Sequence, residues 1–241
     1  MSLQGKTVLI TGAARRVGKA MALAAARAGM DVIIHHGHSP QEAEVTAQEI
    51  EMLGRHAIVL DADLDDPEQV VELVERAWKV QPFYALVNSA SIFEPLRWDR
   101  VELTAWDRHM RINLTAPFLL SQAFARRLGP TGSGRIVNIV DWRALRPGPD
   151  HLPYTISKAG LAALTRSFAQ AMAPQIIVNG IAFGAILPPS DGGDNPHLLA
   201  QVPAGRWATL DEVGETLIFL LDGPDYITGE IIHLDGGRHL V

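Results

Sequence analysis

Short apolar runs rich in valine and isoleucine alternate with stretches of helical periodicity along the whole chain. The apolar runs predict seven strands, at residues 7–10, 31–34, 56–60, 83–87, 135–140, 175–178 and 230–234. The periodic stretches predict helices at residues 17–28, 40–53, 67–80, 104–113, 116–128, 153–172 and 211–221. Apolar strands separated by helices indicate an α/β fold: a doubly wound, seven-stranded parallel sheet with helices on both faces.

No internal repeat, low-complexity tract or shift in composition divides the chain, so residues 1–241 are expected to form a single domain. Ser39 precedes the helix at 40–53 and is expected to cap it. Residues 184–196 are rich in proline, glycine and aspartate and lead into a weaker helical stretch. We expect a loop of about residues 184–205 to cover a substrate, although plain disorder would give the same composition.

Composition and charge narrow the classes of function. The chain has 241 residues, of which 47% are hydrophobic and 20% charged, as in ordinary globular proteins. A net charge of −6 leaves no basic footprint for a nucleic-acid partner. The absence of cysteine excludes disulfides, thiolate zinc sites and cysteine nucleophiles. The start of the chain has no signal-peptide layout and no apolar run is long enough to span a membrane, so we expect a cytoplasmic protein.

A possible acid–base pair follows the fifth predicted strand. Asp141 lies at the carboxyl end of that strand, at the edge where open α/β sheets bind ligands. Tyr154 and Lys158 are four residues apart on the next helix, so their side chains leave the same face. We expect the ammonium group to lower the pKa of the phenol from about 10 and to make Tyr154 an acid and base near neutral pH. A solvated helix face is the alternative interpretation of this spacing.

The first predicted strand runs into a turn that contains two glycines. Gly12 permits a tight turn, and Gly18 permits close packing of the next helix against the strand. Backbone N–H groups at the start of that helix would face outward, where a pyrophosphate can bind. The turn is not the usual dinucleotide pattern G-x-G-x-x-G, and an ordinary turn remains the alternative.

The second predicted strand ends in a histidine-rich tip and lacks the acidic residue that bonds the ribose 2′-hydroxyl of NAD. Arg15, Arg16 and the tip would instead favour the 2′-phosphate of NADP(H). Clustered histidines can bind metals, but no carboxylate or cysteine is adjacent in the sequence, so we expect no metal site. After the third strand, Asp63 is either an acceptor for the adenine amino group or a helix-capping carboxylate.

These motifs together resemble the short-chain dehydrogenase/reductase family over nearly the whole chain. In order they are Thr11-Gly12-Ala-Ala-Arg-Arg-Val-Gly18, Asp63, Asn88-Ser-Ala90, Asn113, Tyr154-x-x-x-Lys158, Asn179 and Asp235-Gly-Gly237. The resemblance implies a Rossmann-type fold, with Tyr154 as catalytic acid and base and Lys158 holding the nicotinamide ribose. Asn113 would orient a water in the proton path. The residues expected to contact NADP(H) are Gly12, Arg15, Arg16, Val17, Gly18, His36, His38, Ser39, Asp63, Leu64, Asn88, Ala90, Tyr154, Lys158 and Gly184.

Departures from the general family pattern indicate a narrower branch. Arg16 replaces the middle glycine of the first turn, Asp141 replaces the usual serine, and Asn88-Ser-Ala-Ser-Ile-Phe93 replaces Asn-Asn-Ala-Gly. These three changes are similar to the pteridine reductase branch, which includes bacterial dihydromonapterin reductases. The pair after the sixth strand, usually Pro-Gly, here reads Phe183-Gly184. The resemblance implies a pterin-like small-molecule substrate that contacts Arg16, Ser91, Phe93, Asp141 and Tyr154.

The physical chemistry of these changes is consistent with pterin reduction. Reduction of a ring C=N bond needs a proton at nitrogen, which Asp141 beside Tyr154 would relay if partial burial raised its pKa. Phe93 offers an apolar face for a flat heterocycle, with nicotinamide on the other side. Each residue also has a plainer interpretation: Phe93 as core, Asp141 as a loop cap and Arg16 as the partner of a surface acid.

Two other functions remain open at this stage. One is a short-chain reductase of a carbonyl substrate, such as a 3-oxoacyl thioester or a small ketone. The other is a non-catalytic dinucleotide-sensing protein, which the presence of Asn113, Tyr154 and Lys158 disfavours. The family resemblance alone implies a homotetramer, with residues 231–241 as a plausible interface.

Overall fold

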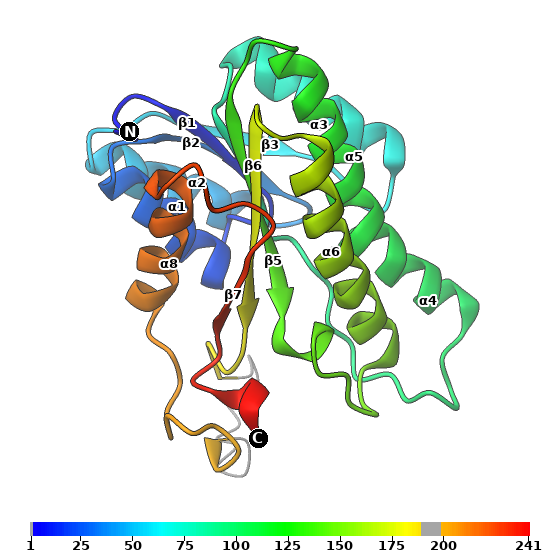
Figure 1. Ribbon diagram of the computed structural model, residues 1–241. Coiled ribbons are helices and arrows are strands. Elements are labelled where there is room, and N and C mark those ends of the chain that lie inside the picture. Colours follow the sequence, from blue (N-terminus) through cyan, green and yellow to red (C-terminus); the bar gives the residue numbers. More distant parts are fainter. Residues whose placement is uncertain (1, 189–198) are drawn as a thin grey trace.

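A parallel sheet of seven strands forms the centre of the computed structural model, which describes residues 2–188 and 199–241 (Figure 1). The strands lie in the order β3-β2-β1-β4-β5-β6-β7, and every neighbouring pair is parallel. Their bounds are β1 Thr7–Ile10, β2 Asp31–His36, β3 Ala57–Asp61, β4 Ala85–Asn88, β5 Gly134–Asp141, β6 Ile176–Phe183 and β7 Ile231–Leu234. The expected doubly wound, Rossmann-type fold is confirmed.

Helices cover both faces of the sheet (Figure 1). Their bounds are α1 Arg16–Arg27, α2 Pro40–Met52, α3 Pro67–Val80, α4 Leu103–Met110, α5 Ala116–Leu128, α6 Leu152–Ala171 and α8 Leu210–Asp222. One core lies between the sheet and α1, α2 and α8, and a second lies between the sheet and α3, α5 and α6. Successive side chains of strand β1 point to opposite faces of the sheet, so Val8 and Ile10 lie in the first core and Leu9 lies in the second.

Most expected elements lie within a few residues of their observed bounds, and β6 is the main exception. It continues to Phe183 and pairs with β5 over eight residues, whereas the sequence indicated an end at Val178. Asn179 and Gly180 interrupt the apolar run and conceal the second half of the strand. The Asn179 side chain is satisfied locally, because it donates to Ile227 O (2.7 Å) and accepts from the Glu230 N–H (2.9 Å).

Two helical features also differ from expectation. Helix α4 passes through a π-helical turn, Arg111–Thr115, directly into α5, and Asn113 lies inside that turn. Ser39 occupies the position before α2, but its side chain makes no capping hydrogen bond, so the expected cap is wrong. Ser39 instead lines a cavity beside the first glycine turn.

The strand order reverses between β1 and β4, and the crevice at this point is where α/β sheets bind ligands. Residues 189–198 of the expected substrate loop lie outside the described residues, as does the start of the weaker helical stretch that follows. Within the described ranges, no helix is both long and apolar enough to cross a membrane.

Candidate active site

Asp141 and Tyr154 form a buried hydrogen-bonded pair. Asp141 is the last residue of β5, and Tyr154 lies in the first turn of α6. The Tyr154 hydroxyl donates to Asp141 Oδ2 over 3.0 Å, and the residues are 7% and 9% exposed. Asp141 Oδ1 meanwhile accepts the Arg143 backbone N–H over 2.8 Å. One carboxyl group therefore caps the turn after β5 with one oxygen and faces the phenol with the other.

Burial dominates the electrostatics of this pair. It raises the pKa of Asp141, and burial together with the Asp141 carboxylate raises the pKa of Tyr154 well above 10. The expectation that Lys158 lowers the Tyr154 pKa is thus wrong for the protein without ligands. The Lys158 ammonium donates to Ile139 O over 2.7 Å and lies 5.8 Å from the centre of the Tyr154 ring. The Tyr154 hydroxyl therefore keeps its proton at neutral pH.

Lys158 is completely enclosed at the centre of the site. The residue is 2% exposed, and burial lowers the pKa of its ammonium to about 8. Its charge is thus retained at neutral pH but is lost at mildly alkaline pH.

The Asn113 side chain holds the segment after β4. Its Oδ1 accepts from Ile92 N (2.9 Å) and the Ser91 hydroxyl (3.1 Å), and its Nδ2 donates to Ile92 O (3.0 Å) and Ser157 Oγ (3.1 Å). Ser157 Oγ in turn donates to Tyr154 O over 2.7 Å. The Asn113 side-chain amide is saturated and positions this segment, and the expectation that Asn113 orients a water stays a prediction.

Phe93 lies beside Tyr154 and outside the core. It is 53% exposed, its ring meets the Tyr154 ring edge-on at 4.7 Å, and His151 stacks on it at 4.0 Å. The core interpretation of Phe93 is therefore excluded. The neighbouring Ser91 directs its hydroxyl hydrogen to Asn113 Oδ1 or Ile92 O, so it is expected to meet a ligand mainly as an acceptor.

A cavity of about 520 Å³ lies beside the first glycine turn. Its lining includes most of the residues expected to contact a cofactor: Gly12, Arg15, Arg16, Val17, Gly18, His36, His38, Ser39, Ala90 and, from the expected substrate contacts, Ser91. The turn is tight, since Gly12 has a φ of 67° and a Cβ at Gly18 would overlap the Gly12 carbonyl oxygen. This leaves the backbone at the start of α1 open to an approaching phosphate.

His35 holds this turn, and the sequence interpretation missed it. His35 lies inside β2 and is 2% exposed; its Nδ1 accepts the Gly12 N–H over 3.2 Å and its Nε2 lies 3.1 Å from Ala62 O. These contacts require a neutral ring protonated at Nε2, and burial lowers the pKa of His35 to about 4. A histidine at the end of an otherwise apolar strand was the available signal.

Several of the residues expected to contact the cofactor do not line this cavity. Asp63 is exposed and accepts the Asp65 N–H over 2.9 Å, and Leu64 is buried in the core under α3. Neither residue lines the cavity. A Cβ at Gly184 would lie 2.6 Å from Asp235 Cα, so packing against the end of β7 explains this glycine.

Arg16 is the first residue of α1, and Asn88 is the last residue of β4. The Arg16 guanidinium donates to Pro188 O over 3.1 Å and so links the first turn to the segment after β6. Asn88 Nδ2 donates to Asn138 Oδ1 over 2.8 Å, while its Oδ1 is buried without a partner among the described residues. Arg16 therefore keeps donors for a further polar group, whereas Asn88 is 2% exposed and also donates to Ser121 Oγ over 3.3 Å.

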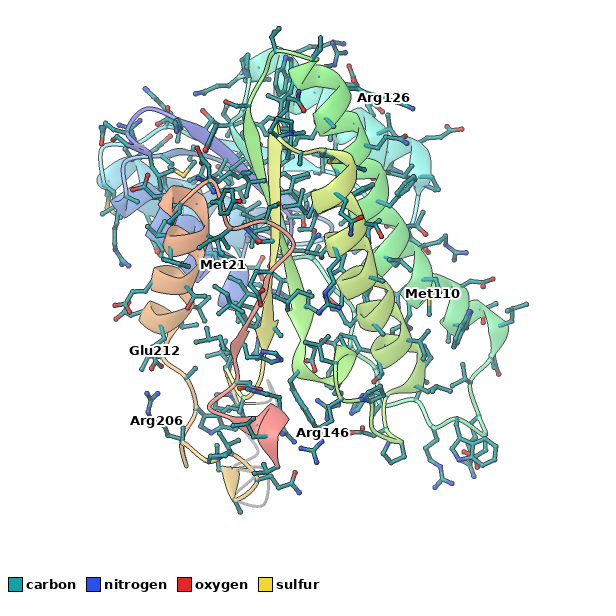
Figure 2. All side chains as sticks on the ribbon, in the orientation of Figure 1. Met21, Met110, Arg126, Arg146, Arg206 and Glu212 are labelled. Atoms are coloured by element: carbon teal, nitrogen blue, oxygen red, sulfur yellow. The ribbon has the colours of Figure 1, made fainter. Side chains whose placement is uncertain are left out.

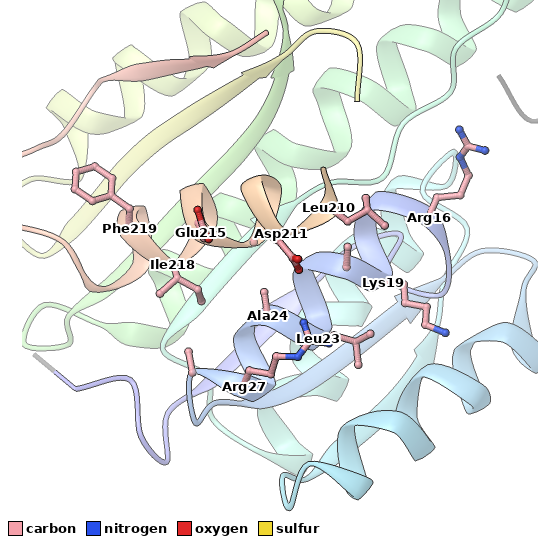
Figure 3. Close-up of a pocket in the computed structure, with 13 residues that line it drawn as sticks. Arg16, Lys19, Leu23, Ala24, Arg27, Leu210, Asp211, Glu215, Ile218 and Phe219 are labelled. Atoms are coloured by element: carbon pink, nitrogen blue, oxygen red, sulfur yellow. The ribbon is translucent and has the colours of Figure 1, made fainter. Parts of the chain in front are cut away.

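A second, larger groove of about 960 Å³ lies between α1 and α8 (Figure 3). Its floor is mostly apolar and includes Leu23, Ile218 and Phe219. It shares only Arg16 with the cavity at the glycine turn, and it lies on the outer side of the helices. The chemistry of the buried Asp141–Tyr154 pair therefore places the candidate active site at the strand ends and not in this groove.

Comparison with known proteins agrees with this geometry. The family model for short chain dehydrogenases matches residues 6–197. A 2-dehydro-3-deoxy-D-gluconate 5-dehydrogenase of Bacillus subtilis is 34% identical, over 98% of this chain and 95% of its own. A 3-oxoacyl-[acyl-carrier-protein] reductase of Synechocystis sp. is 32% identical, over 98% of each chain. Among solved structures, FolM alternative dihydrofolate reductase 1 from Brucella canis, complexed with NADP, is 37% identical with a TM-score of 0.92, over 100% of this chain and 97% of its own. The chain belongs to the short-chain dehydrogenase family.

Proposed function

We propose that this protein is an NADP(H)-dependent reductase that transfers hydride to the ring of a dihydropterin. The observation that carries the proposal is the Asp141 carboxyl group 3.0 Å from the Tyr154 hydroxyl, with both groups buried. A proton held between these groups is suited to delivery at a ring nitrogen. The similarity to FolM alternative dihydrofolate reductase 1 supports this choice of substrate.

The cavity beside the glycine turn fits NADP(H). Its wall includes His36, whose Nδ1 is buried without a partner among the described residues. Arg15, His38 and Ser39 lie on the same wall and would bind the 2′-phosphate, with Glu42 as the one carboxylate in the lining. The N–H groups at the start of α1 would hold the pyrophosphate. NADP-bound structures of similar proteins support the same cofactor.

The residues around the cleft have separate roles in the proposed reaction. When bound, NADPH supplies hydride to a carbon of the pterin C=N bond. Tyr154 would donate its hydroxyl proton to the ring nitrogen, and the phenolate would then regain a proton from solvent through the Asp141 carboxyl group, whose pKa is raised by burial. Phe93 forms one wall for the flat ring, and Lys158, buried beside Tyr154, is suited to hold the nicotinamide ribose.

Two wall positions set the polar contacts of the ring. Ser91 is placed to accept from an amino group of the pterin, since its own hydrogen is engaged by Asn113 or Ile92. Arg16, which reaches Pro188 O, is placed to meet both a cofactor phosphate and a polar edge of the substrate. The proposal also includes assembly as a homotetramer through β7, the edge strand, and the exposed tail residues Leu240 and Val241.

Reduction of a carbonyl compound is the second candidate, because the curated relatives include a 3-oxoacyl-[acyl-carrier-protein] reductase and a gluconate dehydrogenase. Steady-state rates with 7,8-dihydrobiopterin, dihydromonapterin and dihydrofolate, set against a panel of ketones and 3-oxoacyl thioesters, separate the two. Ketone turnover far above every pterin would refute the proposal. Tight NADPH binding with no turnover of any acceptor would instead identify a dinucleotide-sensing protein.

Asp141→Ser tests the residue on which the proposal rests. The change should lower kcat for dihydropterins about 10²- to 10⁴-fold, the usual worth of a positioned proton donor, while the Kd for NADPH changes little. Asp150→Asn is the matched control, because Asp150 contacts Arg143 and not Tyr154. An equal loss of pterin reduction and NADPH binding would show that Asp141 only maintains the structure.

A further inference from the structure

Rings and guanidinium groups alternate along one side of the cleft. The Arg143 guanidinium lies 5.9 Å from the centre of the Phe93 ring and 5.0 Å from that of Trp142. The Arg238 guanidinium lies 4.4 Å from the same Trp142 ring. These three contacts join the Phe93 wall, beside Tyr154, to the C-terminal segment after β7. We call the set Phe93, Arg143, Trp142 and Arg238 the cation–ring ladder.

The far end of the ladder opens into a cavity of about 590 Å³. Its lining is Trp142, Ala200, Gln201, Pro203, Arg238 and Val241. The Asp141 carboxyl group acts electrostatically on Arg238, which lines this cavity, so the cavity lies near the proton-donating pair. The cavity and the glycine turn have no lining residue in common, so it is separate from the space that suits the cofactor.

The two arginines of the ladder are unequally neutralised. Arg143 has Asp150 at 2.9 Å and Asp141 at 3.9 Å, although its Nε is buried without an acceptor among the described residues. Arg238 has no carboxylate within salt-bridge distance in the described ranges, and its guanidinium donates to Gln201 Oε1 over 3.3 Å. The carboxylates of Asp141, Asp150 and Asp235 act on Arg238 only from beyond salt-bridge distance, so this nearly buried cation, whose described hydrogen-bond partner is a neutral amide, still favours a direct anionic partner.

We propose that Arg238, with Gln201 beside it, binds an oxyanion at the end of a substrate arm that extends along the ladder from a ring held at Phe93. The inference rests on the proposed pterin reduction and narrows its substrate to ring compounds that carry a carboxylate or phosphate on an extended arm. Trp142 supplies a flat surface for the arm, and Arg143 supplies a second positive charge along it. A short neutral arm would leave Arg238 without this contact.

The kinetic test compares substrates that share a ring and differ in the arm. Arg238→Gln should lower kcat/KM for dihydrofolate, whose arm ends in carboxylates, by about 10- to 100-fold, as for loss of a hydrogen bond to a charged group. The value for 7,8-dihydrobiopterin, whose arm is neutral, should stay within about twofold. A dihydropterin phosphate ester, measured in parallel, distinguishes carboxylate from phosphate recognition by the size of its own loss.

Arg146→Gln is the matched control. Arg146 is exposed near the same C-terminal segment (Figure 2), donates to His239 O over 3.5 Å and does not line the cavity. The Arg146→Gln substitution removes the same charge from the same region and should leave kcat/KM for both substrates unchanged. Thermal unfolding of each variant shows whether Arg238 merely pins the tail to Trp142. An equal loss for both substrates, or a lower Tm without a change in selectivity, would overturn the inference.

A binding measurement separates this inference from the proposed function. Calorimetric titration with p-aminobenzoyl-L-glutamate, an arm without a pterin, needs no turnover; p-aminobenzamide is the neutral comparison. Binding that is lost in Arg238→Gln supports the subsite even if no pterin is reduced. Reduction of all pterins with no preference for the acidic arm, and no effect of Arg238→Gln, would leave the proposed function in place and remove the subsite.

Discussion

Protonation of His35, which holds the first glycine turn, should make the free energy of unfolding depend on pH. His35 accepts the Gly12 N–H at Nδ1 and lies close to Ala62 O at Nε2, so the folded protein needs the neutral ring. Its pKa falls from the ordinary 6.5 to about 4 because of burial. In the unfolded chain the ring accepts a proton at a higher pH than in the folded protein, so acid favours unfolding.

The size of the change in the free energy of unfolding follows from the shift in the His35 pKa. Each pKa unit corresponds to about 1.4 kcal/mol, so the change from 6.5 to about 4 means that neutral His35 contributes about 3 kcal/mol to the free energy of unfolding. This contribution is fully present above pH 6.5. It is lost progressively as the pH falls from 6.5 to about 4.

Urea unfolding at pH 7.5, 6 and 5, followed by tryptophan fluorescence at fixed protein concentration, measures the effect. Other groups titrate in the same range, so the informative quantity is the difference between the wild type and His35→Asn. Asparagine keeps an acceptor near the position of Nδ1 but cannot take up a proton. The variant should be less stable at pH 7.5 and should lose less stability on acidification. Equal losses for the two proteins would refute the assignment.

Three further predictions concern the site. Tyr154→Phe should lower kcat at least about 100-fold with little change in the Kd for NADPH, because the proton donor is removed and the ring remains; an equal effect on both would contradict its role. The Lys158 ammonium has a pKa of about 8 and loses its charge above that pH, so turnover should fall as the pH rises through 8; Lys158→Arg, which stays charged, should show no such decline in whatever activity it keeps. Gly18→Ala places a Cβ against the Gly12 carbonyl oxygen and should weaken NADPH binding, measured by fluorescence titration, more than Gly54→Ala, which strains the backbone at a φ of 75° but adds a Cβ in open space and lies outside the cavity lining.

The regular part of the fold could be predicted because each strand is an apolar run that ends near a turn residue. The pairing of Asp141 with Tyr154 also followed from elementary rules, since a strand end and the first turn of the next helix meet at one edge of the sheet. The end of β6 could not be found in this way. The Asn179 side chain makes its hydrogen bonds, and Gly180 its strand pairing, with residues that lie about fifty positions further along the chain.

The electrostatics of the site were harder to predict than its geometry. The ammonium of Lys158 is one helical turn from Tyr154, yet it donates to Ile139 O, and burial raises the Tyr154 pKa. Burial depends on the packing of the whole sheet and is not encoded in the four-residue spacing. For the same reason the sequence indicated a histidine-rich tip after the second predicted strand, whereas His35 lies inside β2 and supports the glycine turn.

The saturated amide of Asn113 couples the position of the segment that carries Phe93 to the position of helix α6. One side of this amide grips the backbone that leads to Phe93, and the other reaches Ser157, which bonds the carbonyl of Tyr154. The wall that receives a ring and the helix that supplies its proton therefore share one rigid joint. The losses of kcat caused by Ser157→Ala and by Asn113→Ala should be strongly non-additive in the double variant. A substitution that moves the Phe93 segment to change substrate selectivity should also shift Tyr154.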